Sequence, residues 1–403
     1  MSGRLSGDDR GSAWLLIIGI ALVSLNLRPA IVSVSPLLDA IRTSLELSNA
    51  EVSFLTAVPV FLIGAFALAA PPIVRRLGSE SGVFWGVVLI GVGTAARLWG
   101  GYLSVLIVTT VLVGVGIGIV QALLPAMVKV YFPERAAFAT GLYTVSLTVG
   151  ATAASGATVP LERLLGSWPG ALAIWALVAL VALVAWLPVQ RGRSRDSTRT
   201  MQSSTPSTDG SWSLWRDPLT WLLTLFYAFN TSIYYSILTW LPPRYTALGW
   251  SEAAAGLVLT VFIVASLVGM LLIMAFGDRV ADRRVWLVPL LSLALVGAVG
   301  TALSPETAPW LWAATFGLGL GAWFTLMLML PVDYAADSDA TSELSAIALA
   351  GGYMIGAVAP FSVGALRDIY GGFTGAFVGL AALVALGLLA SFLLGPERSV
   401  TRP

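Results

Sequence analysis

An arginine stands near the middle of the first long apolar stretch of the chain, in the run Asn26-Leu27-Arg28-Pro29. A fixed charge at the centre of a membrane-crossing helix costs about 2.5–3.5 kcal/mol on insertion scales, so it needs a partner in the protein or in a ligand. The planar guanidinium of Arg28 suits paired hydrogen bonds to a carboxylate or another oxyanion. Two roles are open to it. It either bonds helix carbonyls beside Pro29, which frees a backbone acceptor, or it binds an anionic or strongly polar solute.

The rest of the sequence offers no obvious internal partner for this charge. Aspartate and glutamate are missing from the middle of every long apolar stretch; Asp39, Glu51 and Asp333 lie near the ends of theirs. The chain has neither histidine nor cysteine, which excludes imidazole and thiolate chemistry and most zinc, copper and haem ligation. A membrane enzyme would need a nucleophile with its base, or a metal site. We therefore expect no catalytic residue and no cofactor.

Two further polar groups occur at helical spacing in the stretch 103–130. Gln121 and Lys129 are separated by two steps of four residues, so they share one helix face. Lys129 is either a second positive contact on an anion path or an interfacial side chain that extends toward water. We take both residues as candidate substrate contacts.

A polar stripe also runs along the stretch 216–240, where Tyr227, Asn230 and Tyr234 follow three-and-four spacing. Such a stripe either lines a cavity or bonds neighbouring membrane helices. We interpret it as cavity lining. Aromatic residues in membrane helices usually pack or lie at the interface, so three others are weaker candidates for substrate contacts: Tyr143, Trp323 and Tyr353.

The elements that must position these side chains are membrane helices. The chain is 57% hydrophobic and 11% charged, whereas soluble proteins carry about 25% charged residues. Stretches near the ~20 residues needed for a helical span recur along the whole length. We predict an all-α membrane protein with twelve transmembrane helices, at 13–37, 50–70, 81–100, 103–130, 137–159, 168–188, 216–240, 252–276, 285–303, 309–331, 341–365 and 373–395.

One polar segment divides these spans into six and six. Residues 189–215 are rich in arginine, serine, threonine and glycine, which is typical of a flexible linker. We predict an N-terminal half at 1–188, a cytoplasmic linker at 189–215 and a C-terminal half at 216–403. Four residue pairs that contain proline or glycine predict turns between spans: Pro71-Pro72, Pro133-Glu134, Pro242-Pro243 and Gly371-Gly372. The Ser48…Glu51 spacing predicts a capping box at the start of the second span.

Basic residues predict the orientation. Cytoplasmic loops carry an excess of Lys and Arg. With both termini in the cytoplasm, most of the 22 basic residues fall on the inner side. Arg28 lies within the membrane, and the outer side holds only Arg42, Arg97, Arg163, Arg244 and Arg367. We expect a multi-pass protein of the inner membrane.

The two halves resemble each other in one loop. The loops after the second and the eighth span are both short and basic, at equivalent positions of the halves. Parallel halves with a site at the midplane between them are typical of secondary transporters. We predict that the charged residues of these loops brace the cytoplasmic face and act in gating: Arg75, Arg76, Asp278, Arg279, Arg283 and Arg284.

Four motifs stand out along the chain: Asn26-Leu27-Arg28-Pro29, Leu124-Pro125-Ala126-Met127-Val128-Lys129, Trp240-Leu241-Pro242-Pro243 and Gly352-Tyr353…Pro360…Val363-Gly364…Asp368. With the features above, they resemble the major facilitator superfamily and, within it, the family of cyanate porters and 2-nitroimidazole exporters. The resemblance covers essentially the full length. Asn230 stands where that family leads us to expect glutamine, and Leu320 and Trp323 stand at positions expected to be polar or small. These departures concern the expected cavity and leave the substrate open.

The sequence thus predicts a transporter of a small anion or small polar solute, such as a cyanate- or nitrate-like anion or a nitroimidazole-like compound, working by alternating access. No nucleotide-binding motif is present, so direct ATP coupling is not expected. The alternatives are a multidrug-type exporter of apolar compounds and, less favoured, an integral membrane enzyme or a channel. The net charge of +1 gives no reason to expect nucleic-acid binding. We expect a monomer in the lipid bilayer.

Overall fold

The computed structural model describes residues 7–132, 136–193, 216–280, 282–335 and 338–395, and within these ranges the regular structure is helical. Ten helical segments of the described residues are long and apolar enough to cross a membrane. Two further helices, α8 with 30 residues and α13 with 29, are more polar than these and lie at the fifth and seventh predicted spans. The all-α fold of twelve spans is confirmed.

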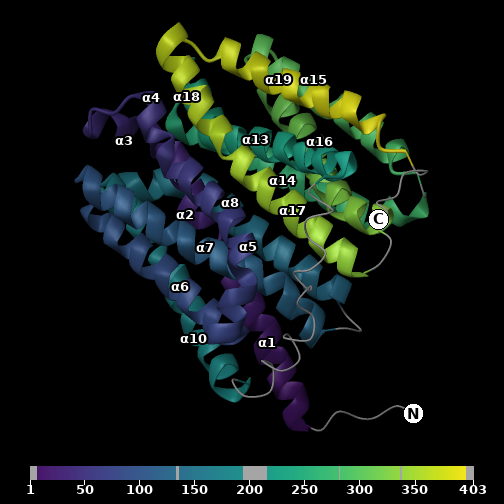
Figure 1. Cartoon of the computed structure of the whole chain (residues 1–403). Coiled ribbons are helices and arrows are strands. Elements are labelled where there is room, and N and C mark those ends of the chain that lie inside the picture. Colours follow the sequence, from purple (N-terminus) through teal and green to yellow (C-terminus); the bar gives the residue numbers. More distant parts are fainter. Residues whose placement is uncertain (1–6, 133–135, 194–215, 281, 336–337, 396–403) are drawn as a thin grey trace.

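The helices form two groups that follow the sequence (Figure 1). The first group runs from purple to teal and comprises α1 Gly7–Asn26, α2 Pro29–Val32, η1 Ser35–Leu37, α3 Leu38–Ser44, α4 Asn49–Val52, α5 Phe54–Leu77, α6 Ser79–Ala96, η2 Arg97–Trp99, α7 Leu103–Tyr131, α8 Ala136–Leu165, α9 Trp168–Ala173 and α10 Ala176–Arg193. The second runs from teal-green to yellow and comprises α13 Pro218–Thr246, α14 Glu252–Phe276, η5 Gly277–Arg279, α15 Arg284–Leu303, α16 Pro309–Tyr334, α17 Ser338–Gly356, α18 Val358–Tyr370 and α19 Thr374–Ser391.

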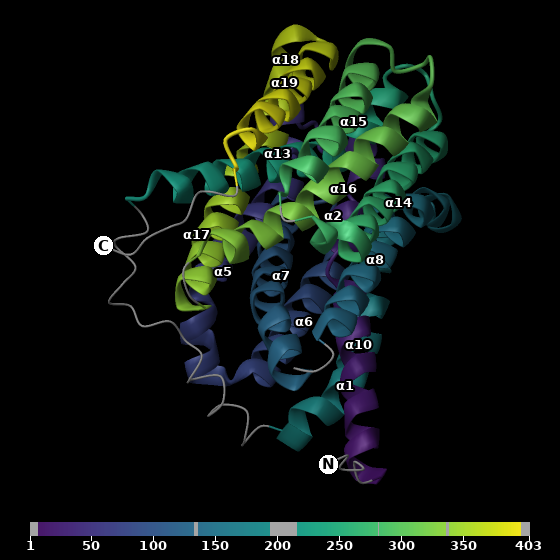
Figure 2. The same cartoon turned by 90° about the vertical axis from the view of Figure 1, so that its right-hand side faces the viewer.

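The two groups, called the N-half and the C-half below, meet along two main seams. Helix α5 packs against α17, and α8 packs against α14. Figure 2 shows these pairs from the side. Successive spans alternate in direction, so the start of α1 and the end of α19 lie at one end of the bundle. We call this the terminal end and the other the opposite end. Helix α10 continues to Arg193, so the first five residues of the expected linker are helical; 194–215 lie outside the described residues.

The first span breaks at Arg28. Helix α1 ends at Asn26, and α2 begins at Pro29 with Arg28 in the N-cap position. Proline has no N–H and fits the first position of a helix, so Pro29 ends one helix and starts the next. The bare backbone of Gly150 lets α8 approach closely, because a Cβ there would lie 2.1 Å from the Leu25 carbonyl oxygen. The break therefore places Arg28 beside α8.

Two of the predicted turns are wrong. Pro71-Pro72 lie inside α5, and Pro242-Pro243 lie inside α13. Membrane helices tolerate proline where neighbouring groups satisfy the freed carbonyls. Pro243 cannot donate to the carbonyl of Thr239, and the Ser35 hydroxyl donates to that carbonyl instead, over 2.9 Å.

Two other local predictions are confirmed, and one cannot be placed. The turn at Gly371 adopts the left-handed conformation with φ of 68°, which favours glycine. The capping box of Ser48 and Glu51 opens the second span. Residues 133–135, with the turn expected at Pro133-Glu134, lie outside the described residues.

Candidate functional site

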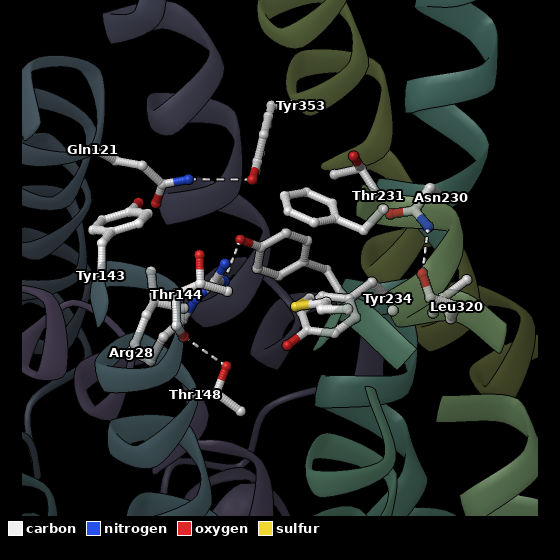
Figure 3. Close-up of a pocket in the computed structure, with 15 residues that line it drawn as sticks. Arg28, Gln121, Tyr143, Thr144, Thr148, Asn230, Thr231, Tyr234, Leu320 and Tyr353 are labelled. Carbon is white, nitrogen blue, oxygen red and sulfur yellow. Dashed lines mark hydrogen bonds between the residues drawn. The ribbon is translucent and has the colours of Figure 1, made fainter. Parts of the chain in front are cut away.

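Arg28 lies between the two halves with 7% of its surface exposed. Its Nη1 donates a hydrogen bond to the phenol oxygen of Tyr235 on α13, over 2.5 Å (Figure 3). The guanidinium carbon lies 5.8 Å from the ring centroid of Tyr234 and 5.4 Å from that of Tyr235. A cation over an aromatic face at such distances is attracted by the ring quadrupole. The guanidinium of Arg28, in the N-half, is therefore stabilised by two aromatic rings of the C-half.

The charge of Arg28 has no acidic counterpart in the described part of the chain. The described ion pairs involve other arginines, and the ionisable groups that face the guanidinium are the phenols of Tyr143, Tyr234, Tyr235 and Tyr353. Its Nε is buried without a hydrogen-bond partner among the described residues. A buried charge calls for fuller compensation than one phenol oxygen provides. The site thus retains donor capacity for an anionic oxygen or nitrogen.

A cavity of about 60 Å³ adjoins Arg28. Both halves contribute to its wall, as Figure 3 shows. The lining combines one guanidinium, four phenols, three threonine hydroxyls and two amides with a few apolar groups. The residues are Arg28, Gln121, Tyr143, Thr144, Leu147, Thr148, Asn230, Thr231, Tyr234, Tyr235, Met270, Leu320, Gly321, Phe324 and Tyr353.

Six predicted contacts meet at this cavity: Arg28, Gln121, Tyr143, Asn230, Tyr234 and Tyr353. A second hydrogen bond between the halves joins two of them, from Gln121 Nε2 to the Tyr353 hydroxyl over 3.1 Å. The Asn230 amide donates over 3.1 Å to the carbonyl of Leu320. That bond connects α13 to α16, and it directs the Asn230 Nδ2 toward a backbone carbonyl rather than toward a ligand.

Two predicted contacts lie outside the cavity lining. Trp323 is fully buried, with its ring 4.9 Å from that of Phe226 and against Gly387. Tyr227 is also buried, and its Cβ packs on the bare backbone of Gly352. Both positions serve helix packing within the C-half. Lys129 belongs to α7, but its side chain lies outside the described residues.

Tyr235 and the threonines Thr144, Thr148 and Thr231 line the cavity without having been predicted. The stripe through Tyr227 and Tyr234 drew attention to one face of α13. Thr231 and Tyr235 form a second polar pair four residues apart, and that pair was the available signal. Asn230 and Tyr234 of the first stripe line the cavity together with this second pair. How far around α13 the cavity-facing side extends depends on the rotation of the helix, and the sequence of a single helix does not reveal it.

A second cavity of about 330 Å³ continues from the first toward the terminal end. Thr144, Met270 and Phe324 line both cavities. At its far side Arg283 pairs with Asp333 over 2.8 Å and donates to the Gly277 carbonyl. An anion at Arg28 would thus have a route to the terminal end past one further arginine.

The other predicted gating residues lie near this end. Arg284 pairs with Asp282 over 3.0 Å, and this bond is the main cause that lowers the pKa of Asp282. The guanidinium of Arg279 stacks 4.4 Å from the Phe276 ring centroid, and Arg76 is exposed. These contacts all lie within one half. The side chains of Arg75 and Asp278 lie outside the described residues.

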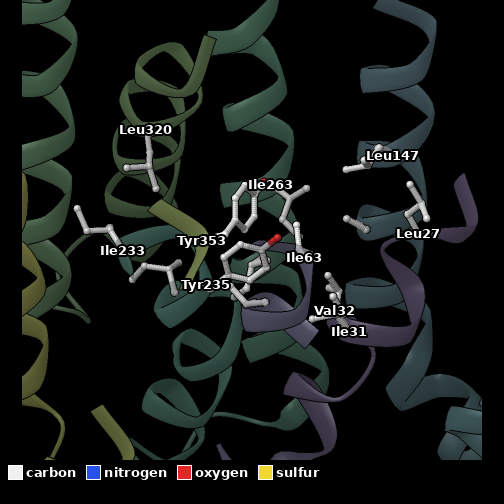
Figure 4. Close-up of a cluster of buried hydrophobic side chains, with 14 of the residues drawn as sticks. Leu27, Ile31, Val32, Ile63, Leu147, Ile233, Tyr235, Ile263, Leu320 and Tyr353 are labelled. Atoms are coloured by element: carbon white, nitrogen blue, oxygen red, sulfur yellow. The ribbon is translucent and has the colours of Figure 1, made fainter. Parts of the chain in front are cut away.

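The opposite end is sealed between the halves. The Asp368 carboxylate of α18 accepts hydrogen bonds from the backbone N–H groups of Asn49 and Ala50, and the Thr246 hydroxyl donates to Asp39 over 2.9 Å. Nearer the site, Ile31 and Val32 follow Arg28 and are about as buried as Ile63 of α5. Figure 4 shows these apolar groups close to Tyr235. The site is therefore closed toward the opposite end.

Comparison with known proteins agrees with this architecture. Residues 13–337 match the Major Facilitator Superfamily. The chain is 34% identical to a 2-nitroimidazole transporter of Escherichia coli, over 99% of both chains. It is 33% identical to the cyanate transport protein CynX of Escherichia coli, over 89% of this chain and 91% of that one. The crystal structure of a D-xylose-proton symporter superposes with a TM-score of 0.76 at 13% identity, covering 96% and 98% of the two chains.

Proposed function

We propose that this protein moves a small monovalent anion, which binds Arg28 in the central cavity. The proposal starts from its family, because the chain belongs to the Major Facilitator Superfamily and is a multi-pass membrane transporter. The observation that carries this proposal is the buried guanidinium, which has a free Nε and no carboxylate partner among the described residues. A guanidinium fork binds linear or trigonal oxyanions through paired hydrogen bonds. The threonine hydroxyls and the phenols other than Tyr235, whose oxygen accepts from Arg28, would donate the remaining hydrogen bonds.

The size of the cavity supports a small substrate. Pockets for drug-sized ligands measure about 300–1,000 Å³, whereas the cavity at Arg28 measures about 60 Å³. The second cavity, of about 330 Å³, is not lined by Arg28, so the space at the guanidinium itself favours a small substrate over the large apolar compounds of a multidrug-type exporter. Cyanate, which names one relative, has the charge and dimensions that the site favours. A nitroimidazole, which names another, is the second candidate, because the rings of Tyr234 and Tyr235 offer stacking surfaces for a flat heterocycle.

The mechanism that we propose is alternating access between the N-half at 1–188 and the C-half at 216–403, joined by the linker at 189–215. Movement of one half against the other around a fixed central site is the common mode of such folds. The excess of basic residues favours a cytoplasmic terminal end and an inner-membrane location. In that orientation the seal at Asp368 faces outward, and the route past Arg283 leads to the cytoplasm. We further propose that the carrier works as a monomer.

Binding and flux with matched arginine variants test the proposal. Purified protein is screened by thermal shift against cyanate, nitrate, nitrite and 2-nitroimidazole, and uptake of radiolabelled cyanate is measured in proteoliposomes. We expect cyanate to stabilise wild type but not Arg28→Ala, and uptake by that variant to be lost. Arg163→Ala, at an exposed arginine, is the control and should behave as wild type. Undiminished binding and uptake by Arg28→Ala would contradict the assignment of the site.

A further inference from the structure

We propose that the phenol of Tyr235 takes the place of the substrate on Arg28 in the empty carrier, and that this contact makes the protein a net transporter rather than an obligatory exchanger. The inference rests on the proposed binding of an anion at Arg28 and adds a transport mode to it. Three features of the site carry it: the bond of Arg28 to Tyr235, a second bond between the halves, and the lack of a carboxylate partner for Arg28 among the described residues.

The first feature is a charge-assisted bond between the halves. Arg28 Nη1 and the Tyr235 oxygen are 2.5 Å apart, and both residues are buried, with 7% and 2% of their surfaces exposed. A phenol oxygen can accept as well as donate, so Tyr235 offers the guanidinium the kind of atom that an oxyanion would offer. The contact links the first span to the seventh, which belong to different halves.

The second feature is that groups of the two halves also contact each other elsewhere at the site. Gln121 of α7 donates to Tyr353 of α17, and the rings of Tyr353 and Tyr235 lie 6.1 Å apart in a T-shaped arrangement. Arg28, Tyr235, Tyr353 and Gln121 therefore form one connected polar and aromatic set that spans both halves. Every contact in this set is made between groups of the protein itself.

The third feature is energetic. An obligatory exchanger needs a high barrier against closing while empty, and a buried charge without a partner supplies such a barrier. No carboxylate of the described residues pairs with Arg28, so the barrier would be high if Tyr235 did not face it. The phenol oxygen and ring face lower that barrier. The empty carrier can then reorient and return for another anion.

The inference predicts different effects on two rates, that of anion exchange by the loaded carrier and that of the return of the empty carrier. In the loaded carrier the anion supplies the acceptor for Arg28, so loss of the Tyr235 hydroxyl should leave exchange of anion for anion almost unchanged. In the empty carrier, loss of the Tyr235 hydroxyl leaves a buried guanidinium N–H of Arg28 unbonded. The empty return step should then slow by about tenfold or more, the usual consequence of losing a hydrogen bond to a charged group. Because the phenol also competes with the anion, its removal should tighten anion binding.

The experiment compares wild type, Tyr235→Phe and Tyr227→Phe in proteoliposomes. Tyr227 lies on the same helix, is equally buried and does not line the cavity. Uptake of radiolabelled cyanate, with labelled nitrate as a second probe, is measured into vesicles that are empty or preloaded with the same unlabelled anion. We expect wild type and Tyr227→Phe to take up anion in both cases. Tyr235→Phe should keep uptake into preloaded vesicles, lose most uptake into empty ones, and bind cyanate more tightly.

Two results would overturn the inference. One is wild-type uptake confined to preloaded vesicles, which means obligatory exchange. The other is an equal loss of both uptake modes in a Tyr235→Phe protein whose melting temperature matches wild type, because the hydroxyl would then serve the loaded carrier. Either result leaves the proposed function intact if uptake still depends on Arg28. Uptake that survives Arg28→Ala contradicts the proposed function itself, so the two failures are distinguishable.

Discussion

Asp368 and Asn49 connect the two halves at the opposite end of the bundle. The Asp368 carboxylate accepts hydrogen bonds from the backbone nitrogen of Asn49 over 3.1 Å and from its Nδ2 over 2.6 Å. A third bond comes from the backbone of Ala50, over 2.8 Å. These N–H groups begin the second span, where a helix favours negative charge. This part of the seal depends on one carboxylate, and opening toward this end must break all three bonds.

Replacing that carboxylate should favour the state that is open to the opposite end. Asp368→Asn removes the charge from three hydrogen bonds, each of which contributes about 1.5–3 kcal/mol when charged. We expect a shift of the conformational equilibrium by about tenfold or more. The chain has no cysteine, so a single Val32→Cys reporter, buried in this structure, can be labelled with an impermeant maleimide. Its labelling from the opposite side should accelerate.

Glu51→Gln is the matched control for this prediction. Glu51 is a neighbouring carboxylate, but it caps Ser48 within the N-half. Its replacement should not change labelling of the reporter. Equal labelling rates of the reporter with and without the Asp368→Asn substitution would mean that the seal does not depend on the carboxylate.

A lysine should not replace Arg28. The ammonium is a point charge without the planar fork, so it cannot donate the paired, coplanar hydrogen bonds that an oxyanion accepts from a guanidinium. We expect Arg28→Lys to reduce cyanate uptake at least about tenfold, the scale set by loss of one charge-assisted bond. Isothermal titration of cyanate and vesicle flux provide the measurements, with Arg163→Lys as the exposed control. Wild-type affinity in Arg28→Lys would mean that charge alone, without geometry, defines the site.

Trp323 should be dispensable for binding. It packs on Phe226 outside the cavity, and its indole nitrogen has no hydrogen-bond partner among the described residues. Trp323→Phe removes a buried unsatisfied donor, which offsets part of the lost packing. We expect unchanged cyanate affinity and a change in melting temperature of only a few degrees. A tenfold loss of affinity without loss of stability would instead place Trp323 in the site.

Gly321 should tolerate no side chain. A Cβ there would lie 2.0 Å from the carbonyl oxygen of Ser266, so α14 and α16 would have to separate. Such overpacking costs about 1–3 kcal/mol or more. We expect Gly321→Ala to lower the melting temperature in detergent by several degrees. Gly375 also lies in a helix but faces open space, so Gly375→Ala should raise stability slightly. Equal melting temperatures for the two variants would contradict the close packing.

Some features of this protein are local, and the sequence determines them by itself. The apolar length of the spans requires helices, because the backbone must satisfy its own hydrogen bonds in lipid. Gly371 and the Ser48–Glu51 pair mark helix ends through their own conformations and side chains. The importance of Arg28 follows from the cost of its charge in an apolar segment.

Other features depend on how the helices pack, and only the tertiary structure decides them. The rotation of α13 selects Tyr235 rather than Tyr227 as a cavity residue, although both lie in one helix. Ser35 satisfies the carbonyl that Pro243 frees, so a predicted turn is helix. Trp323 faces a packing seam and not the cavity. In each case the deciding contact is with a residue that is more than a hundred positions away in the sequence or on a different helix. The positions of such residues depend on how both halves pack, and the local spacing of residues does not determine that packing.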